Sequence, residues 1–134
     1  MTKDLIEQFM DRVWKKHDLT VIDELFIPDT IVHSPLGEYR GAQAMREAVQ
    51  HWLIAFPDLI VTNGHVTAEE DRVVWQWTAR GTHQGTFKGV AATGRPVNYS
   101  GATVYRVRDG KIVEYWAYVD TAHVLAQLKQ EASV

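Results

Sequence analysis

An aspartate ends a run of β-branched and aromatic residues near the end of the chain. Asp109-Gly110 is a strong hairpin signal, because a type I′ turn needs positive φ at both central positions. The run from 111 to 119 that follows it is typical of a strand. Alternation across that strand predicts one face with Ile112, Glu114, Trp116, Tyr118 and Asp120. If this face is buried, loss of water makes the Asp120 carboxylate a stronger base, as a general acid/base requires.

The same aspartate has a purely structural interpretation. Apolar residues at 122, 124, 125 and 128 predict a short helix directly after it. Aspartate is a common N-cap, because its carboxylate accepts hydrogen bonds from the first free N–H groups of a helix. Asp120 is therefore a candidate base, a candidate cap, or both.

A histidine lies at the end of another predicted strand, from Arg72 to His83. Strand alternation puts His83 on the same face as Trp75 and Trp77. In a pocket it would orient a substrate carbonyl or hold Asp120 in place. A histidine on an apolar face is also found as a structural residue that its neighbours hydrogen-bond.

Helical and strand patterns are segregated along the chain. Apolar residues recur at helical spacing from 5 to 14, a short helix is predicted from Val21 to Phe26, and a third runs from about 44 to 56. Strand patterns follow from 59, from 72 and from Val97 to Val107, with Asn63-Gly64 as a possible bulge. This order predicts an α+β fold, in which a long, twisted antiparallel sheet wraps around the helices and leaves a pocket.

The connecting segments contain the remaining polar and glycine-rich stretches. A short strand is expected from Thr30 to Ser34, followed by a polar loop from Leu36 to Gly41. The stretch from Gly85 to Gly94 holds three glycines and is a candidate loop or lid.

Length and composition limit the classes of function. The 134 residues fit one domain, 1–134, and a net charge of −3 without a basic patch argues against nucleic acid and membrane surfaces as partners. The chain has no cysteine, so it offers no disulfide and no thiolate nucleophile. The acidic N-terminal segment does not resemble a signal peptide, which leads us to expect a cytoplasmic protein.

Five short motifs together resemble one protein family. In chain order they are Phe56-Pro57-Asp58, Gly81-Thr82-His83-Gln84-Gly85, Thr93-Gly94-Arg95, the hairpin Asp109-Gly110 with Glu114-x-Trp116-x-x-x-Asp120, and Gln127-Leu128. Their order and spacing are similar to those of SnoaL-like polyketide (ester) cyclases. The resemblance extends over most of the chain, from about Ile31 to Leu128.

The resemblance implies a fold, a reaction and a set of site residues. The fold is the α+β cone of the nuclear-transport-factor-like superfamily, with a central cavity, which ketosteroid isomerases and limonene epoxide hydrolases share. The reaction is an intramolecular aldol ring closure with Asp120 as general acid/base, assisted by His83 and without metal or organic cofactor. The resemblance also places His33 near the cavity mouth. The predicted substrate-binding residues are His33, Trp75, Trp77, Tyr99, Trp116 and Tyr118.

Several alternatives stay open at this point. The aromatic residues are core packing or cavity walls, and His33 is a pocket residue or a surface one. His33, His83 and Asp120 have the composition of a two-histidine, one-carboxylate metal site, although no closely spaced histidine pair supports it. The protein could instead be a non-catalytic binder of a small hydrophobic or aromatic molecule, or a hydrolase or hydroxylase of the same fold.

A homodimer is expected by resemblance, because the open sheet face in this fold commonly packs against a second copy. On the strand that carries Asp120, we expect the buried dimer face to hold Val113, Tyr115, Ala117 and Val119.

Overall fold

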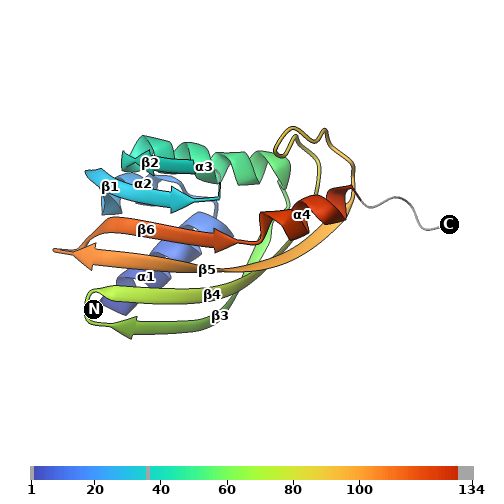
Figure 1. Ribbon diagram of the computed structural model, residues 1–134. Helices are drawn as coiled ribbons and strands as arrows, with labels where there is room; N and C mark the ends of the chain where they lie inside the picture. Colours follow the sequence, from blue (N-terminus) through green and yellow to red (C-terminus); the bar gives the residue numbers. More distant parts are fainter. Residues whose placement is uncertain (1, 36, 130–134) are drawn as a thin grey trace.

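A computed structural model of the chain describes residues 2–35 and 37–129 (Figure 1). Across these residues no helix is both long enough and apolar enough to cross a membrane. The elements, in chain order, are α1 (Thr2–Met10), a π-helical turn η1 (Asp11–Lys15), α2 (Thr20–Leu25), β1 (Phe26–Ser34), β2 (Gly37–Arg40), α3 (Gly41–Ala55), β3 (Ile60–Glu69), β4 (Arg72–Thr82), β5 (Pro96–Arg108), β6 (Lys111–Val119) and α4 (Thr121–Leu128).

The six strands form one sheet in the order β2-β1-β6-β5-β4-β3. All neighbours are antiparallel except β1 and β6, which pair in parallel, so the predicted antiparallel sheet holds except for this one pair. The segment predicted as a polar loop is partly wrong. Its residues 37–40 form β2, because Ser34 pairs with Gly37 and closes a hairpin onto β1. Leu36 lies outside the described residues.

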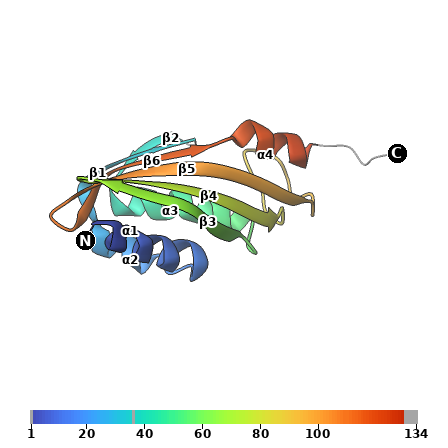
Figure 2. The same cartoon turned by 90° about the horizontal axis from the view of Figure 1, so that it is seen from below.

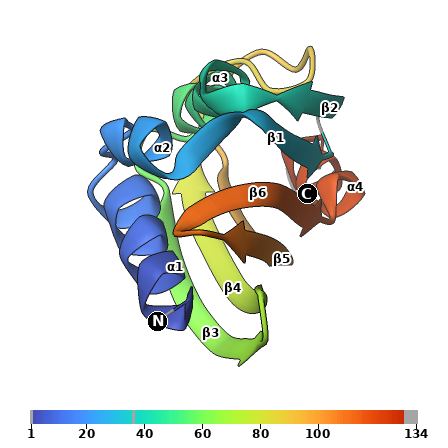
Figure 3. The same cartoon turned by 90° about the vertical axis from the view of Figure 1, so that its left-hand side faces the viewer.

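The sheet curls around the N-terminal helices, as predicted. Seen from one end (Figure 3), it bends from β2 round to β3, and α1 and α2 lie beside it. Helix α1 contacts β3 and β4, whereas α3 contacts β1 and β2. Figure 2 shows α1 and α2 below the sheet and α4 beyond the end of β6. The concave face is therefore closed by helices at both sides, which is the shape of a cone with a space inside.

Glycines allow the close approaches that this curvature needs. A Cβ on Gly101 in β5 would lie 2.5 Å from the Trp77 ring and 2.5 Å from the Tyr118 carbonyl oxygen. Only glycine therefore lets the indole of Trp77 lie against the strand. The pairing of β3 with β4 shifts between Asn63 and Val66, which confirms the predicted irregularity at Asn63-Gly64.

Strand β6 contains an irregularity that its sequence pattern does not indicate. Glu114 pairs with Arg106 and Ile112 pairs with the next residue, Val107, so Val113 is an extra residue in β6. Such a bulge reverses the side-chain alternation that follows it. Ile112 is inside, but from there on the inner face carries Tyr115, Ala117 and Val119.

The predicted face is thus correct only in part: Trp116, Tyr118 and Asp120 lie in one groove and Glu114 lies on the same outer side, whereas Ile112 points inward. The predicted dimer face is wrong, because Tyr115, Ala117 and Val119 line the cavity. The hairpin prediction itself is confirmed, since φ is 52° at Asp109 and 73° at Gly110.

An ionic cluster on the outer face of the sheet connects the β1–β2 hairpin with β6. His33 in β1 lies with Nδ1 3.1 Å from Glu38 Oε2 and Nε2 2.8 Å from Glu114 Oε2. Its ring stacks on Trp116 at 5.4 Å, and the Arg72 guanidinium lies 5.4 Å from the same indole. The hydrogen bond with Glu114, helped by Glu38, raises the pKa of His33 against a smaller effect of burial.

This cluster predicts a pH-dependent stability. Because the pKa of His33 is raised in the folded state, its contribution is complete below the unfolded value of about 6.5. It is lost as the pH rises through the folded value. We expect the thermal midpoint to fall as the pH rises from about 6.5 through the raised pKa of folded His33, as measured by circular dichroism.

His33→Gln is expected to remove this fall. His65→Gln is the control, because His65 is exposed on β3. An unchanged pH profile in His33→Gln would exclude His33 as its cause.

Candidate functional site

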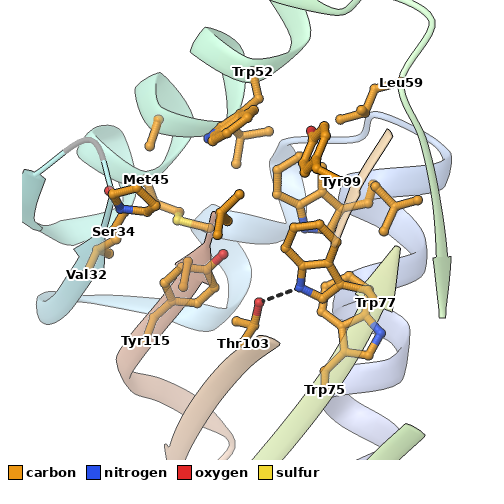
Figure 4. Close-up of a pocket in the computed structure, with 17 residues that line it drawn as sticks. Val32, Ser34, Met45, Trp52, Leu59, Trp75, Trp77, Tyr99, Thr103 and Tyr115 are labelled. Carbon is orange, nitrogen blue, oxygen red and sulfur yellow. Dashed lines mark hydrogen bonds between the residues drawn. The ribbon is translucent and has the colours of Figure 1, made fainter. Parts of the chain in front are cut away.

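A cavity lies between the concave face of the sheet, α3 and the turn η1 (Figure 4). Every wall contributes side chains: the turn η1, the end of β1, helix α3, the start of β3, and β4, β5 and β6. The lining residues are Trp14, Val32, Ser34, Pro35, Met45, Ala48, Val49, Trp52, Leu59, Val61, Trp75, Trp77, Tyr99, Thr103, Tyr115, Ala117 and Val119.

The cavity is narrow. The space between its walls, including the part that is open to solvent, is about 570 Å³. The centre of a water molecule can occupy only about 50 Å³ of this space, because the rest lies too close to side-chain atoms. One ordered water needs roughly 10–15 Å³ of such space, so the inner part holds only a few waters. A ligand larger than one or two rings must extend through the mouth or displace side chains.

Stacked aromatic rings form much of the wall. The ring of Tyr99 lies 5.5 Å from Trp52 and 5.9 Å from Trp77, which in turn lies 5.9 Å from Trp75. The indole N–H of Trp75 donates to Asn63 Oδ1 at 3.0 Å and is thereby satisfied away from the ligand space. Flat aromatic walls with few polar atoms favour a flat, apolar ligand.

The polar atoms of the cavity are hydroxyl and indole groups. Trp77 Nε1 donates to Thr103 Oγ1 at 3.0 Å, and the phenol of Tyr115 lines the same cavity. Burial raises the pKa of both Tyr99 and Tyr115, so both phenols stay protonated. The indole nitrogen of Trp14 is buried and makes no hydrogen bond to any described residue. The cavity thus offers neutral hydrogen-bond donors.

No residue that lines this cavity is an acid, a histidine, a lysine or an arginine. Nor do the described parts of the chain contain a group of three or more His, Asp or Glu side chains that could hold a metal ion. The cavity can therefore bind and orient a neutral molecule, but a charged acid or base can act on that molecule only from the mouth.

Asp120 does not line the cavity but lies in a groove beside it. Its Oδ1 accepts a hydrogen bond from the backbone N–H of His123 at 3.0 Å, so it is the N-cap of α4. The side chain is exposed. It lines an open groove that shares four residues with the cavity, namely Ser34, Pro35, Ala117 and Val119. The structure thus confirms that Asp120 is the N-cap of α4, and its carboxylate lies in a groove next to the cavity.

His83 is buried in a different place. It is fully buried, and Nδ1 accepts a hydrogen bond from the backbone N–H of Thr93 at 3.1 Å and lies 2.9 Å from Thr93 Oγ1. Backbone hydrogen bonds of 2.9 Å to Arg95 and 2.8 Å from Gly94 join the same two segments. His83 lines neither the cavity nor the groove with Asp120. This geometry favours the structural interpretation, in which the hydrogen bonds of His83 hold the end of the loop that follows β4.

The loop from Gly85 to Gly94 is anchored at its tip as well as at its base. Phe87 is fully buried, with its ring 4.9 Å from Trp52 and 5.5 Å from Phe56. Its backbone pairs with Val90 in both directions. The loop is therefore packed against the C-terminal end of α3.

The structure brings together only some of the residues that we predicted to bind substrate or to act in catalysis. Trp75, Trp77 and Tyr99 line the cavity, as their shared inner faces on β4 and β5 predict. His33, Trp116 and Tyr118 lie in the outer groove with Asp120, because the β6 bulge turns these β6 side chains outward. The sequence did not predict that α3 lines the cavity. The helical spacing of Met45, Val49 and Trp52 indicated only that this side of the helix is buried. Trp14, Thr103 and Tyr115 were missed as well.

The comparisons with known proteins agree with the fold. Residues 4–128 match the family model described as SnoaL-like polyketide cyclase. No curated protein sequence matches the chain at a significant level. The structure is similar to AclR, a suggested hydroxylase from Streptomyces galilaeus, with 34% identity, a TM-score of 0.83, and coverage of 99% of this chain and 83% of AclR.

Two further solved structures extend this similarity. IdmH, a suggested polyketide cyclase from Streptomyces antibioticus, is 32% identical with a TM-score of 0.82, over 97% of this chain and 99% of IdmH. A suggested SnoaL-like polyketide cyclase from Jannaschia sp. CCS1 is 22% identical with a TM-score of 0.90, over 98% of this chain and 93% of the other, and supports the fold alone. Because the family model covers nearly the whole described chain, this protein belongs to the SnoaL-like polyketide cyclase family.

Proposed function

We propose that this protein binds a small, flat, largely apolar molecule of polyketide type in the aromatic cavity. The observation that carries the proposal is the chemistry of the cavity wall: aromatic and aliphatic side chains with hydroxyl and indole donors, and no charged side chain among its lining residues. An ionised ligand would lose its hydration in this cavity without gaining a charged partner. A neutral ligand with one or two acceptor oxygens loses little and gains apolar contact.

A cavity-filling substitution tests this proposal. Ala117 lines the cavity on β6, and Ala117→Phe is expected to weaken binding of acetophenone at least tenfold, about 1.4 kcal/mol, because the ring occupies the ligand space. Isothermal titration calorimetry measures the affinity, and circular dichroism verifies the fold. Ala68→Phe is the matched control, since Ala68 is exposed on β3.

If Ala117→Phe does not fold, Ala48→Leu on α3 narrows the same cavity less severely. Binding that is unaffected by both substitutions would mean that the ligand does not enter this cavity.

Ring closure is the second candidate function, and the position of Asp120 favours it. The carboxylate lies in a groove that shares four lining residues with the cavity, so a ligand that protrudes from the mouth passes near it. Asp120 would remove a proton from a carbon between two carbonyl groups. The carbanion would then form a C–C bond to a second carbonyl carbon, whose oxygen becomes an alkoxide and takes the proton back from the Asp120 carboxyl. The cavity would supply the folded geometry of the substrate.

Two substitutions separate the cap from the base. Asp120→Asn keeps an N-cap side chain but cannot take a proton, so we expect ring closure of an open-chain β-keto ester with a pendant ketone to slow by at least about 100-fold. Asp120→Ala is expected to lower the unfolding free energy by about 1 kcal/mol, because the cap is also lost. Product formation is followed by NMR and stability by urea unfolding.

Asp29→Asn, an exposed acid on β1, is the control for the change of charge. If Asp120→Asn closes the ring as fast as the unmodified protein, Asp120 is not the base.

We also propose that the protein forms a homodimer through the outer face of the sheet. Val74, Val104 and Trp116 form one cross-strand row on that face, and Tyr118 beside it is 59% exposed. A contiguous exposed apolar and aromatic surface of this kind is typical of an interface. The ion pairs of Arg106 with Glu114 and Asp71 border the row and supply a polar rim.

Sedimentation velocity tests the dimer. We expect a dimer at micromolar concentration and a shift to monomer in Tyr118→Asp, because a buried unpaired charge opposes association. Ile54→Asp is the matched control, since Ile54 is 64% exposed on α3, away from this face. A monomeric unmodified protein at that concentration would contradict the proposal.

A further inference from the structure

Another groove lies on the outer face of the sheet, beside the contact between α4 and β5 (Figure 1). Its lining residues include Thr78 and Arg80 on β4, Asn98 and Ser100 on β5, and His123 on α4. No aspartate, glutamate or lysine is among the residues that line it. One fixed positive charge and several neutral polar groups therefore meet here without an opposing carboxylate.

Strand pairing places four of these side chains at the corners of a small rectangle. Thr78 pairs with Ser100, and Arg80 pairs with Asn98. Residues two apart on a strand share a face, so all four point to the same side of the sheet. Directly paired side chains are about 5 Å apart at Cβ, and the next positions along each strand are about 7 Å away. Two hydroxyls, an amide and a guanidinium can thus converge on one group a few ångströms across.

Gln127 fixes α4 next to this rectangle. Its amide oxygen accepts a hydrogen bond from the backbone N–H of Asn98 at 2.9 Å, and its amide nitrogen donates to the Asn98 carbonyl oxygen at 2.7 Å. At the other end of the helix, Asp120 Oδ1 accepts a hydrogen bond from the backbone N–H of His123 at 3.0 Å. His123 therefore lines the groove from a helix that is anchored directly on Asn98.

Arg80 has no counter-ion in the part of the chain that the structure describes. It is exposed, and it forms no ion pair with any described residue. The carboxylate of Asp58 is engaged elsewhere, because its two oxygens accept hydrogen bonds from the backbone N–H and the hydroxyl of Thr82, both at 2.7 Å. An anion that binds to the Arg80 guanidinium would therefore displace water and not a protein carboxylate.

The chemistry of the groove fits a phosphate ester. A guanidinium donates two parallel hydrogen bonds to phosphate oxygens, and hydroxyl and amide groups can donate to the other oxygens. Ile60 on β3 pairs directly with Arg80, lines the same groove and is 50% exposed. A free phosphate ion gains nothing from this side chain, whereas the carbon part of an ester would cover it.

We propose that this groove binds the phosphate group of a small phosphate ester, with Arg80 as the main contact and the carbon part of the ester on Ile60. The site is separate from the aromatic cavity, because neither Arg80 nor His123 lines that cavity. It is also separate from the proposed dimer row. Val74 of that row is six residues from Arg80 along β4, which is roughly 20 Å.

Titration of inorganic phosphate and of phenyl phosphate into ¹⁵N-labelled protein tests the site. At constant ionic strength, we expect saturable changes in the amide chemical shifts of Thr78, Arg80, Asn98 and Ser100. Arg80→Gln should weaken the binding of both probes at least about threefold. Arg40→Gln is the matched control and should leave both affinities unchanged, because Arg40 is exposed on β2, at the opposite edge of the sheet.

Two further positions test the recognition of the ester and of the phosphate oxygens. Phenyl phosphate should bind about two- to fivefold more tightly than inorganic phosphate, and Ile60→Thr should remove this preference without weakening inorganic phosphate. Thr78→Val removes one hydroxyl at nearly constant volume and should weaken both probes about two- to threefold. Thr78→Ser keeps the hydroxyl and should restore both affinities.

Several results would overturn the inference. Equal amide shifts in sodium chloride at the same ionic strength would mean that the groove responds to salt in general. Equal effects of Arg80→Gln and Arg40→Gln would mean that phosphate does not bind at Arg80. Equal affinities for the two probes would assign the groove to free phosphate and not to an ester. Loss of phenyl phosphate binding in Ala117→Phe would place that probe in the aromatic cavity, whereas unchanged binding there supports a separate site.

Discussion

One extra residue in β6 decides the chemistry of the whole interior. Val113 has no partner in the regular pairing of β6 with β5, and the side chains after it change faces. In a regular strand, Trp116 and Tyr118 would point inward and Asp120 would continue their row. With the bulge, the cavity receives Tyr115, Ala117 and Val119, which are one phenol and two small apolar side chains. The neutral cavity and the exposed carboxylate are therefore two results of the same backbone irregularity.

Space inside the cone depends on small residues opposite large ones. Trp77 lies against Gly101 on the neighbouring strand, where a Cβ would overlap the indole at 2.5 Å. Ala117 pairs with Thr103 across β5 and β6, so neither strand fills the centre there. The rings of Trp52 and Tyr99 stack at 5.5 Å and hold the opposite side. The packed aromatic sides and the small residues Thr103 and Ala117 between them thus account for the space inside the cone.

The parts of the fold that local patterns determine were predictable, and the parts that pairing determines were not. The Asp109-Gly110 turn and the inner face of Trp75 and Trp77 follow from turn chemistry and strand period. The bulge at Val113 has no glycine or proline to mark it, so a strictly alternating interpretation put β6 in the wrong orientation. Strand β2 was missed because its residues form a strand only by pairing with β1. His83 and Asp120 each matched a family motif; the helical pattern after Asp120 also predicted its N-cap role, which the structure confirms, whereas the bond from the Thr93 N–H to His83 depends on a loop that the sequence does not place.

The distance between the two polar ends of the site limits the molecules that could use both. Tyr115 and Asp120 are five residues apart at the end of β6, and a strand rises about 3.3 Å per residue, so their backbones are roughly 16 Å apart. A single-ring molecule that lies beside Tyr115 remains far from the Asp120 carboxylate. Only an extended molecule, with a carbonyl held inside and its acidic carbon at the mouth, can reach Asp120 as well. The length of a ligand therefore decides whether it contacts only the cavity wall at Tyr115 or reaches the groove with Asp120 as well.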